Sequence, residues 1–200
     1  MSTARDLVIV ALDVAPNRPV TQGDLSLTLA GAEMIDLLRV EAVTIEGDRI
    51  VPRLAPSLDD PLLEHAAAQL VRDKPYESIE DWLWRRGRGL ADAYVTFLEE
   101  EGLVARPRGS WIPFRSARPL PVESPARRRA EHRWAADETV LATLAAAVGM
   151  RDGVPEDAPV PDDAVQAVLT AVVGAVTELD AVRRRRAIED AAFTNVWRGA

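Results

Sequence analysis

The sequence contains no cysteine and only two histidines, His65 and His132, among its 200 residues. The absence of cysteine excludes disulfides, thiolate zinc sites and a cysteine nucleophile. The two imidazoles stand far apart and have no carboxylates at a metal-ligand spacing, so we expect no metal site. Glycine-rich phosphate loops and nucleophile elbows are also missing. The sequence therefore predicts a protein without catalytic activity, resident metal or cofactor.

Long hydrophobic runs are missing as well. The apolar stretch 7–12 is too short for a signal peptide and meets Asp13 rather than a cleavage site. The longest apolar helix candidate, 164–176, is shorter than the ~20 residues that a membrane span requires and is typical of a core helix. With 48% hydrophobic and 28% charged residues the chain has enough apolar side chain for a core. We expect one cytoplasmic domain over residues 1–200.

Most of the chain shows apolar residues at helical spacing. These stripes, with capping residues such as Asp60, Ser78, Ser124 and Asp162, predict helices over 24–40, 60–74, 78–86, 90–101, 124–148, 164–176 and 178–197, with Asp137 as a second start inside the fifth range. The stretch 7–12 is too short for periodicity to separate strand from helix. The fold class is therefore mainly α.

Two short β-hairpins complete the predicted fold. The first spans Thr44 to Val51 around Gly47 and Asp48, and Pro52 limits it to a sheet edge. The second follows the helix that ends at Gly102. It combines extended runs at 103–106 and 110–115, separated by a Pro-Arg-Gly turn.

The second hairpin is locally basic, although the whole chain has a net charge of −8. No Asp or Glu lies between Gly102 and Glu123, and the arginines in this stretch are Arg106, Arg108, Arg115 and Arg118. Apolar side chains accompany them near the turn, namely Trp111, Ile112 and Phe114. This combination suits a contact surface for an anionic partner. It equally suits an ordinary packed hairpin with solvated arginines, and the pattern alone leaves both hypotheses open.

A second basic group precedes the helix at 90–101. Arg85, Arg86 and Arg88 surround Gly87 and Gly89, where a turn at a helix N-terminus exposes backbone N–H groups to an anion. We therefore predict that these three arginines converge on a phosphate. The runs 127–133 and 183–186 are interspersed with or flanked by carboxylates and are predicted to be salt-bridged helix faces.

Four segments, taken in order, carry a resemblance to a known family: LAGAEMIDLLRVEAVTIE, LDDPLLEHAAAQL, FLEEEGLVARPRGSWIPF and ETVLATLAAAVG. In sequence and spacing they resemble the Golgi phosphoprotein family, which includes a eukaryotic Golgi adaptor that binds phosphatidylinositol 4-phosphate and many bacterial relatives. The resemblance implies a helical core ringed by amphipathic helices with a protruding hairpin, and no catalytic centre.

The resemblance also indicates lipid-contacting positions. In the eukaryotic members the pocket uses a tryptophan and an arginine at the start of the first long helix and two arginines before the hairpin. Arg88 matches the first of the latter pair, and its companion position holds Ala91. Ala30 stands at the position of the first-helix arginine, and Thr21 or Gln22 at that of the tryptophan. The hairpin with Trp111, Ile112 and Phe114 resembles the family's self-association and membrane-approaching element.

The favoured function is a non-enzymatic peripheral protein on the inner face of the plasma membrane. It would bind anionic headgroups of the phosphatidylinositol 4-phosphate type through Arg85, Arg86 and Arg88, and membrane or a second copy through the hairpin. One alternative is a winged-helix DNA binder, against which the net charge and the acidic run 99–101 argue. Another is a helical protein-interaction module.

Overall fold

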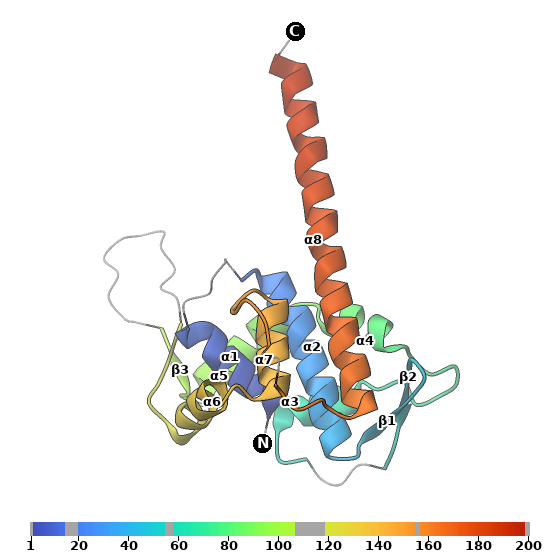
Figure 1. Ribbon diagram of the computed structural model, residues 1–200, viewed down its shortest axis with the longest axis vertical. Coiled ribbons are helices and arrows are strands. Elements are labelled where there is room, and N and C mark those ends of the chain that lie inside the picture. Colours follow the sequence, from blue (N-terminus) through green and yellow to red (C-terminus); the bar gives the residue numbers. More distant parts are fainter. Residues whose placement is uncertain (1, 15–19, 55–57, 107–118, 155–156, 199–200) are drawn as a thin grey trace.

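The computed structural model describes residues 2–14, 20–54, 58–106, 119–154 and 157–198, with side chains up to residue 190 (Figure 1). These residues form eight helices and two two-stranded antiparallel sheets. The elements in chain order are α1 (Thr3–Asp13), α2 (Gln22–Arg39), β1 (Val43–Glu46), β2 (Arg49–Pro52), α3 (Pro61–Ala68), α4 (Ile79–Arg86), α5 (Leu90–Glu100), β3 (Val104–Ala105), β4 (Leu120–Pro121), α6 (Pro125–Ala135), α7 (Thr139–Ala147) and α8 (Asp163–Arg198). The predicted fold class, mainly α with short hairpins, is confirmed.

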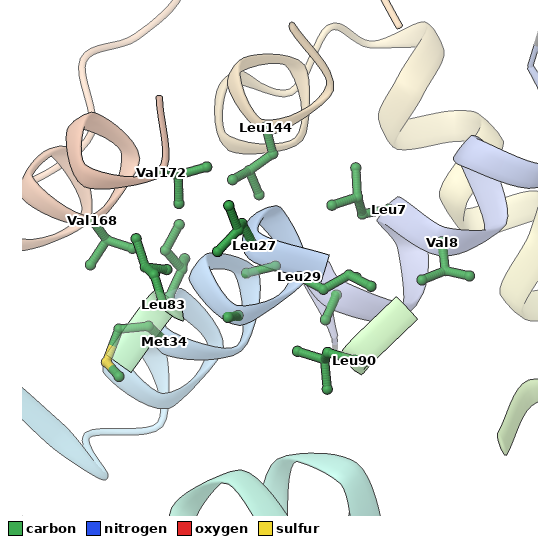
Figure 2. Packing of buried hydrophobic residues seen from close by; sticks show 14 of the residues in the cluster. Leu7, Val8, Leu27, Leu29, Met34, Leu83, Leu90, Leu144, Val168 and Val172 are labelled. Carbon is green, nitrogen blue, oxygen red and sulfur yellow. The ribbon is translucent and has the colours of Figure 1, made fainter. Parts of the chain in front are cut away.

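Helix α2 is the centre of the core. Every residue from Ser26 to Leu37 is buried, so this helix is covered on all sides rather than along one stripe. Helices α1, α4, α5 and α8 pack around it, and Figure 2 shows their leucine and valine side chains meeting those of α2. The indole N–H of Trp82 in α4 donates to the carbonyl of Ala30 at 3.1 Å, which ties α4 to this central helix.

The N-terminal apolar stretch, whose type the sequence left open, lies in helix α1. Its first turn is capped by Ser2 and by a carboxylate from another helix. Asp36 of α2 accepts the backbone N–H groups of Thr3 at 2.6 Å and Ala4 at 3.2 Å. These N–H groups have no partner within their own helix, and a buried carboxylate satisfies them. Whether this stretch forms a helix or a strand thus depends on Asp36, which lies about thirty positions further along the chain.

The two helices predicted over 164–176 and 178–197 are one continuous helix, α8, of 36 residues, so that boundary was wrong. The first half buries its apolar stripe against α2, α4 and α7, and Asp162 caps it as predicted by accepting the N–H of Val165. By length and composition the stretch Asp163–Asp190 could also cross a membrane, but core helices pass the same test, and 33% of its most apolar window is buried in the protein. The second half projects beyond the other elements (Figure 1).

Both predicted hairpins begin where the sequence placed them. Strands β1 and β2 pair with Thr44 opposite Val51, as expected. Strand β3 pairs with β4, with Val104 opposite Pro121, so the return strand within the described residues is Leu120–Pro121. The strand predicted over 110–115 lies outside the described residues.

The predicted helix starts at Asp60, Ser78 and Ser124 are confirmed, since each side chain accepts a backbone N–H of the first turn. The second start at Asp137 is displaced by one residue. Glu138 caps α7 by accepting the N–H of Leu141, and Asp137 occupies a left-handed conformation with φ of 51°. Asp137 therefore lies in the turn before the helix.

Candidate functional site

A shallow groove of about 290 Å³ lies where the start of α2, the turn between α4 and α5, and the middle of α8 meet. It is lined by Gln22, Gly23, Ser26, Leu27, Trp84, Gly87, Arg88, Gly89, Asp92 and Leu179. We call it the Arg88 groove. Helices α2 and α5 both begin at its edge, so the positive ends of two helix dipoles lie near it.

Glycine is required in the turn that carries Arg88. Gly89 has φ of +70°, a conformation that other residues rarely adopt. At Gly87 an added Cβ would lie 2.6 Å from the carbonyl oxygen of Leu83, so the chain packs too closely for a side chain. Helix α5 then begins without a side-chain cap from Gly89, and the N–H of Ala91 donates to Ser26 Oγ of α2 at 3.0 Å. This bond holds the starts of α2 and α5 together.

The three arginines predicted to converge on a phosphate have different environments. Arg85 donates to both carboxylate oxygens of Glu77 at 2.7 Å and does not line the groove. Arg86 is buried and bonded to Glu33, so its predicted contact with a headgroup is wrong. Only Arg88 is exposed at the groove, and no described carboxylate lies within salt-bridge distance of it.

Arg86 belongs to a buried polar cluster that does not line the groove. Its guanidinium donates to both oxygens of Glu33, at 2.7 and 2.8 Å, and the Tyr94 hydroxyl donates to the same carboxylate at 3.1 Å. Burial raises the pKa of Glu33, while the Arg86 hydrogen bonds act to lower it. Burial also raises the pKa of Tyr94 well above its usual value, which keeps the phenol protonated. The cluster joins α2, α4 and α5 and positions the turn that follows Arg86.

The groove carries both signs of charge. Asp92 lines it one helical turn after Arg88, and Asp24 at the start of α2 bonds to Arg183 of α8 at 2.5 Å. The positive contribution therefore comes from Arg88 and the helix starts rather than from a basic cluster. An anion bound there would be held by few contacts, which predicts a weak, salt-sensitive site.

Trp84 is a groove residue that sequence reasoning missed. It lies two positions after the buried Trp82, so it faces another side of α4 and is only partly buried. The sequence signal that could have identified Trp84 is its position outside the apolar stripe of an amphipathic helix. By contrast, Ala30 and Ala91, which stand at two family positions for arginine, are both buried.

The hairpin residues are only partly placed. Arg106 is exposed and bonds to Glu99 of α5 at 2.6 Å. The remaining predicted contact residues, Arg108, Trp111, Ile112, Phe114 and Arg115, lie outside the described residues. Their contact with a membrane or a second copy stays a prediction.

The other arginine runs form salt bridges, as predicted. In α6, Arg127 bonds to Asp13 and Glu131, and Arg133 bonds to the buried Asp6 and to Glu138. In α8, Arg183 and Arg184 are bonded to carboxylates. The α6 pairs attach this helix to α1, because Asp6 and Asp13 both belong to α1. These contacts support the structural role that the charge pattern indicated.

Among the described residues, no group of three or more His, Asp or Glu side chains is arranged to hold a metal ion. A larger cavity of about 940 Å³ lies between the β1–β2 hairpin, the end of α2 and the start of α8. It is lined by arginines and carboxylates alike, including Arg39, Arg53, Glu41 and Asp162, and it contains none of the residues that the sequence predicted to contact a ligand.

Comparison with known families matches residues 4–194 to the family described as Golgi phosphoprotein 3 (GPP34). No curated protein matches the chain. The matched range includes the Arg88 groove, both hairpins and nearly all of α8.

Proposed function

The chain belongs to the Golgi phosphoprotein 3 (GPP34) family, and from this premise we propose that it is a non-enzymatic peripheral membrane protein. In this proposal the Arg88 groove accepts the phosphate of an anionic lipid headgroup. The protein would act from the cytoplasm, at the inner face of the plasma membrane, where anionic lipids attract cationic side chains.

The observation that carries the proposal is the environment of Arg88. Its two basic neighbours are bonded to Glu77 and Glu33, whereas Arg88 is exposed at a groove with no described carboxylate in salt-bridge range. The start of α5 follows Arg88 in the chain, and its first two N–H groups are bonded to the Gly87 carbonyl and to Ser26 Oγ. An exposed guanidinium near a helix start is suited to a phosphate, because the guanidinium donates hydrogen bonds to anionic oxygens and the positive end of the helix dipole favours negative charge.

We further propose that the preferred headgroup is a phosphorylated inositol of the phosphatidylinositol 4-phosphate type. Trp84 supplies an aromatic wall from α4, where the family's eukaryotic pocket uses a tryptophan from the first long helix. The groove of about 290 Å³ has room for a single phosphate and part of an inositol ring. The basic hairpin with Trp111 and Phe114 would add apolar insertion or self-association.

Replacing Arg88 with alanine is expected to weaken binding to anionic liposomes by about 1 kcal/mol, which is about fivefold, because one cation near the surface is lost. Co-sedimentation with vesicles containing phosphatidylserine, phosphatidylinositol or phosphatidylinositol 4-phosphate, at matched total charge, would measure the loss and its headgroup dependence. Raising the salt concentration should also weaken the binding of the wild type to these liposomes.

Arg49→Ala is the matched control, since it removes one exposed positive charge from β2, outside the groove. It should leave liposome binding close to that of the wild type. Equal losses in the two variants would mean that only net charge matters, and the groove would then not be the site. Failure of the wild type to bind at low ionic strength would remove the membrane proposal altogether.

The DNA-binding alternative finds little support in α5, the helix that precedes the hairpin. It contains no lysine or arginine, and its exposed positions include Asp92 and Glu100. A recognition helix of this composition would bring carboxylates to the phosphate backbone, which opposes binding. A gel shift with random duplex, run beside the liposome assay, is expected to show no complex.

A further inference from the structure

Arg183 of α8 lies at the edge of the Arg88 groove. Helix α8 runs beside α2 and α4 (Figure 1), and its Leu179 lines the groove one helical turn before Arg183. The guanidinium of Arg183 reaches from there to the start of α2. A Cβ added to Gly23, which also lines the groove, would stand 2.7 Å from Arg183 Nη2. The missing side chain of Gly23 therefore leaves the space beside which this guanidinium lies.

Only one side of the Arg183 guanidinium is used within the part of the chain that the structure describes. Nη1 donates to Asp24 Oδ1 at 2.5 Å, whereas Nη2, the atom nearest Gly23, has no acceptor among the described residues. The Arg183 side chain is 34% exposed, so a ligand in solution can reach it. Asp24 thus holds the guanidinium in position and leaves it with unused N–H donors.

The first turns of α2 connect Arg183 to the turn that carries Arg88. Gly23 lies against Arg183, and Ser26, about one helical turn later, accepts the N–H of Ala91 at the start of α5. Gly23 and Ser26 both line the groove, as Arg88 does. The first turns of α2 contain no lysine or arginine of their own. A second cation at this groove therefore has to come from another element, and α8 provides one.

We propose that Arg183 is a second headgroup-contacting residue, and that it makes the groove selective for a terminal phosphomonoester held between Arg88 and Arg183. This inference rests on the proposed function of the groove. A phosphomonoester has a charge of roughly −1.5 to −2 near pH 7 and three acceptor oxygens, which suit two guanidinium groups at once. A phosphodiester, the linkage in phosphatidylserine and phosphatidylinositol, has less charge and fewer free oxygens. It gains less from a second arginine.

The competing role for Arg183 is purely structural, as a salt bridge that fastens α8 to α2. Arg184 offers the matched control for separating the two roles. It is the next residue of the same helix, it is bonded to Asp180, and it neither lines the groove nor lies beside Gly23. Replacing either arginine with glutamine removes one positive charge and leaves one carboxylate without its partner.

Arg183→Gln is expected to weaken binding to vesicles with phosphatidylinositol 4-phosphate about fivefold, the effect of one lost cation. Binding to phosphatidylserine vesicles of matched total charge should change much less, so the ratio of the two affinities falls. Arg184→Gln should leave this ratio unchanged. Co-sedimentation measures both affinities, and thermal unfolding of each variant identifies losses that come from destabilisation. A purely structural salt bridge would lower the unfolding temperature without changing the ratio.

Gly23→Ala moves the guanidinium without changing any charge. The new methyl group would displace Nη2, which is the far end of a flexible side chain, so the fold should tolerate it. The preference for phosphatidylinositol 4-phosphate should fall as it does in Arg183→Gln. In the Arg183→Gln background Gly23→Ala should add little, because the displaced group is already gone. A further loss of the same size there would contradict the contact with Gly23 as the basis of the selectivity.

Competition by soluble inositol 1,4-bisphosphate identifies the source of the phosphomonoester. If it displaces the protein from vesicles in an Arg183-dependent way, the phosphate group alone is sufficient. If it does not, while the vesicle preference still depends on Arg183, the phosphate must be held in a lipid. Either result supports the contact between Arg183 and a phosphomonoester.

Two results would overturn the role of Arg183 and leave the proposed function intact. One is a loss of binding in Arg88→Ala with an unchanged affinity ratio in Arg183→Gln. The other is an equal fall of the ratio in Arg183→Gln and Arg184→Gln, because only net charge would then matter. A wild type that binds no anionic vesicle at low ionic strength would instead remove the proposed function, and this inference with it.

Discussion

Substituting Gly31 with alanine is expected to lower the free energy of unfolding by about 3 kcal/mol, at the upper end of the overpacking range. Gly31 lies at the crossing of α2 and α8, and an added Cβ would stand 2.2 Å from Cγ2 of Val172. Val172 is fully buried and β-branched, so its side chain has little freedom to move aside. Either the helices must separate or Val172 must leave its rotamer. Urea unfolding of both proteins measures the difference.

Gly174→Ala is the internal control for this prediction. It adds the same methyl group to α8, but nothing lies within 4 Å of the added Cβ. Alanine favours helix over glycine by about 1 kcal/mol, so this variant should match or exceed the wild type in stability. A second check is Val172→Ala in the Gly31→Ala background, which removes the clashing methyl. If the free energy of unfolding of the double variant falls by the sum of the two single-variant losses, the close crossing is not the cause.

Replacing Arg86 with methionine should have a comparably large effect. We expect it to lower the free energy of unfolding by about 3–5 kcal/mol near neutral pH. The substitution keeps most of the side-chain volume and leaves Glu33 buried without its counter-charge. An unpaired buried carboxylate is costly because no water replaces the lost hydrogen bonds. Thermal or urea unfolding at neutral pH provides the measurement.

The loss of unfolding free energy in Arg86→Met should become smaller as the pH falls. Burial already raises the pKa of Glu33 above its ordinary value of 4.5, and removing Arg86 takes away the group that lowers it. The folded variant then binds a proton more tightly than the unfolded chain. The contribution of the Glu33 proton to the stability of the variant is therefore fully present below pH 4.5 and is lost as the pH rises through the folded pKa. Unfolding curves at about pH 5 and pH 7, each compared with wild type, test this sign.

The control is Arg85→Met in the same helix. The Arg85 side chain is 40% exposed, whereas that of Arg86 is 8% exposed, so water can replace part of what Arg85 provides to Glu77 and the loss should be smaller, about 1–2 kcal/mol. A similar loss in both variants, or a loss from Arg86→Met that does not depend on pH, would contradict the assignment of Glu33 and Arg86 as a buried pair. Retention of full stability by Arg86→Met would contradict it as well.

Local signals in the sequence predicted local structure well. Asp60, Ser78 and Ser124 cap the helices that their positions indicated, because a cap depends on N–H groups only two or three residues away. The turn at Gly47 was predicted for the same reason, since its hairpin is formed by adjacent residues. Where sequence neighbours supply both partners of an interaction, the sequence is sufficient.

Interactions between distant residues were not predictable in this way. Arg85, Arg86 and Arg88 are near neighbours of one chemical type, yet only Arg88 is left for a ligand, because Glu33 and Glu77 approach the other two. The same applies to α1, whose first turn is held by Asp36 of α2. Which of several equivalent side chains meets a buried partner depends on how the helices pack.

The sequence by itself determined the helical class, most helix starts, the two hairpin starts and the family resemblance, because periodicity, caps and motif spacing are properties of neighbouring residues. Only the tertiary structure decided that Trp84 lines the groove with Arg88, that Arg86 is part of the core, and that α8 runs unbroken past the body. Each of these depends on packing around α2, where contacts join residues far apart in the chain and burial determines which charges are paired.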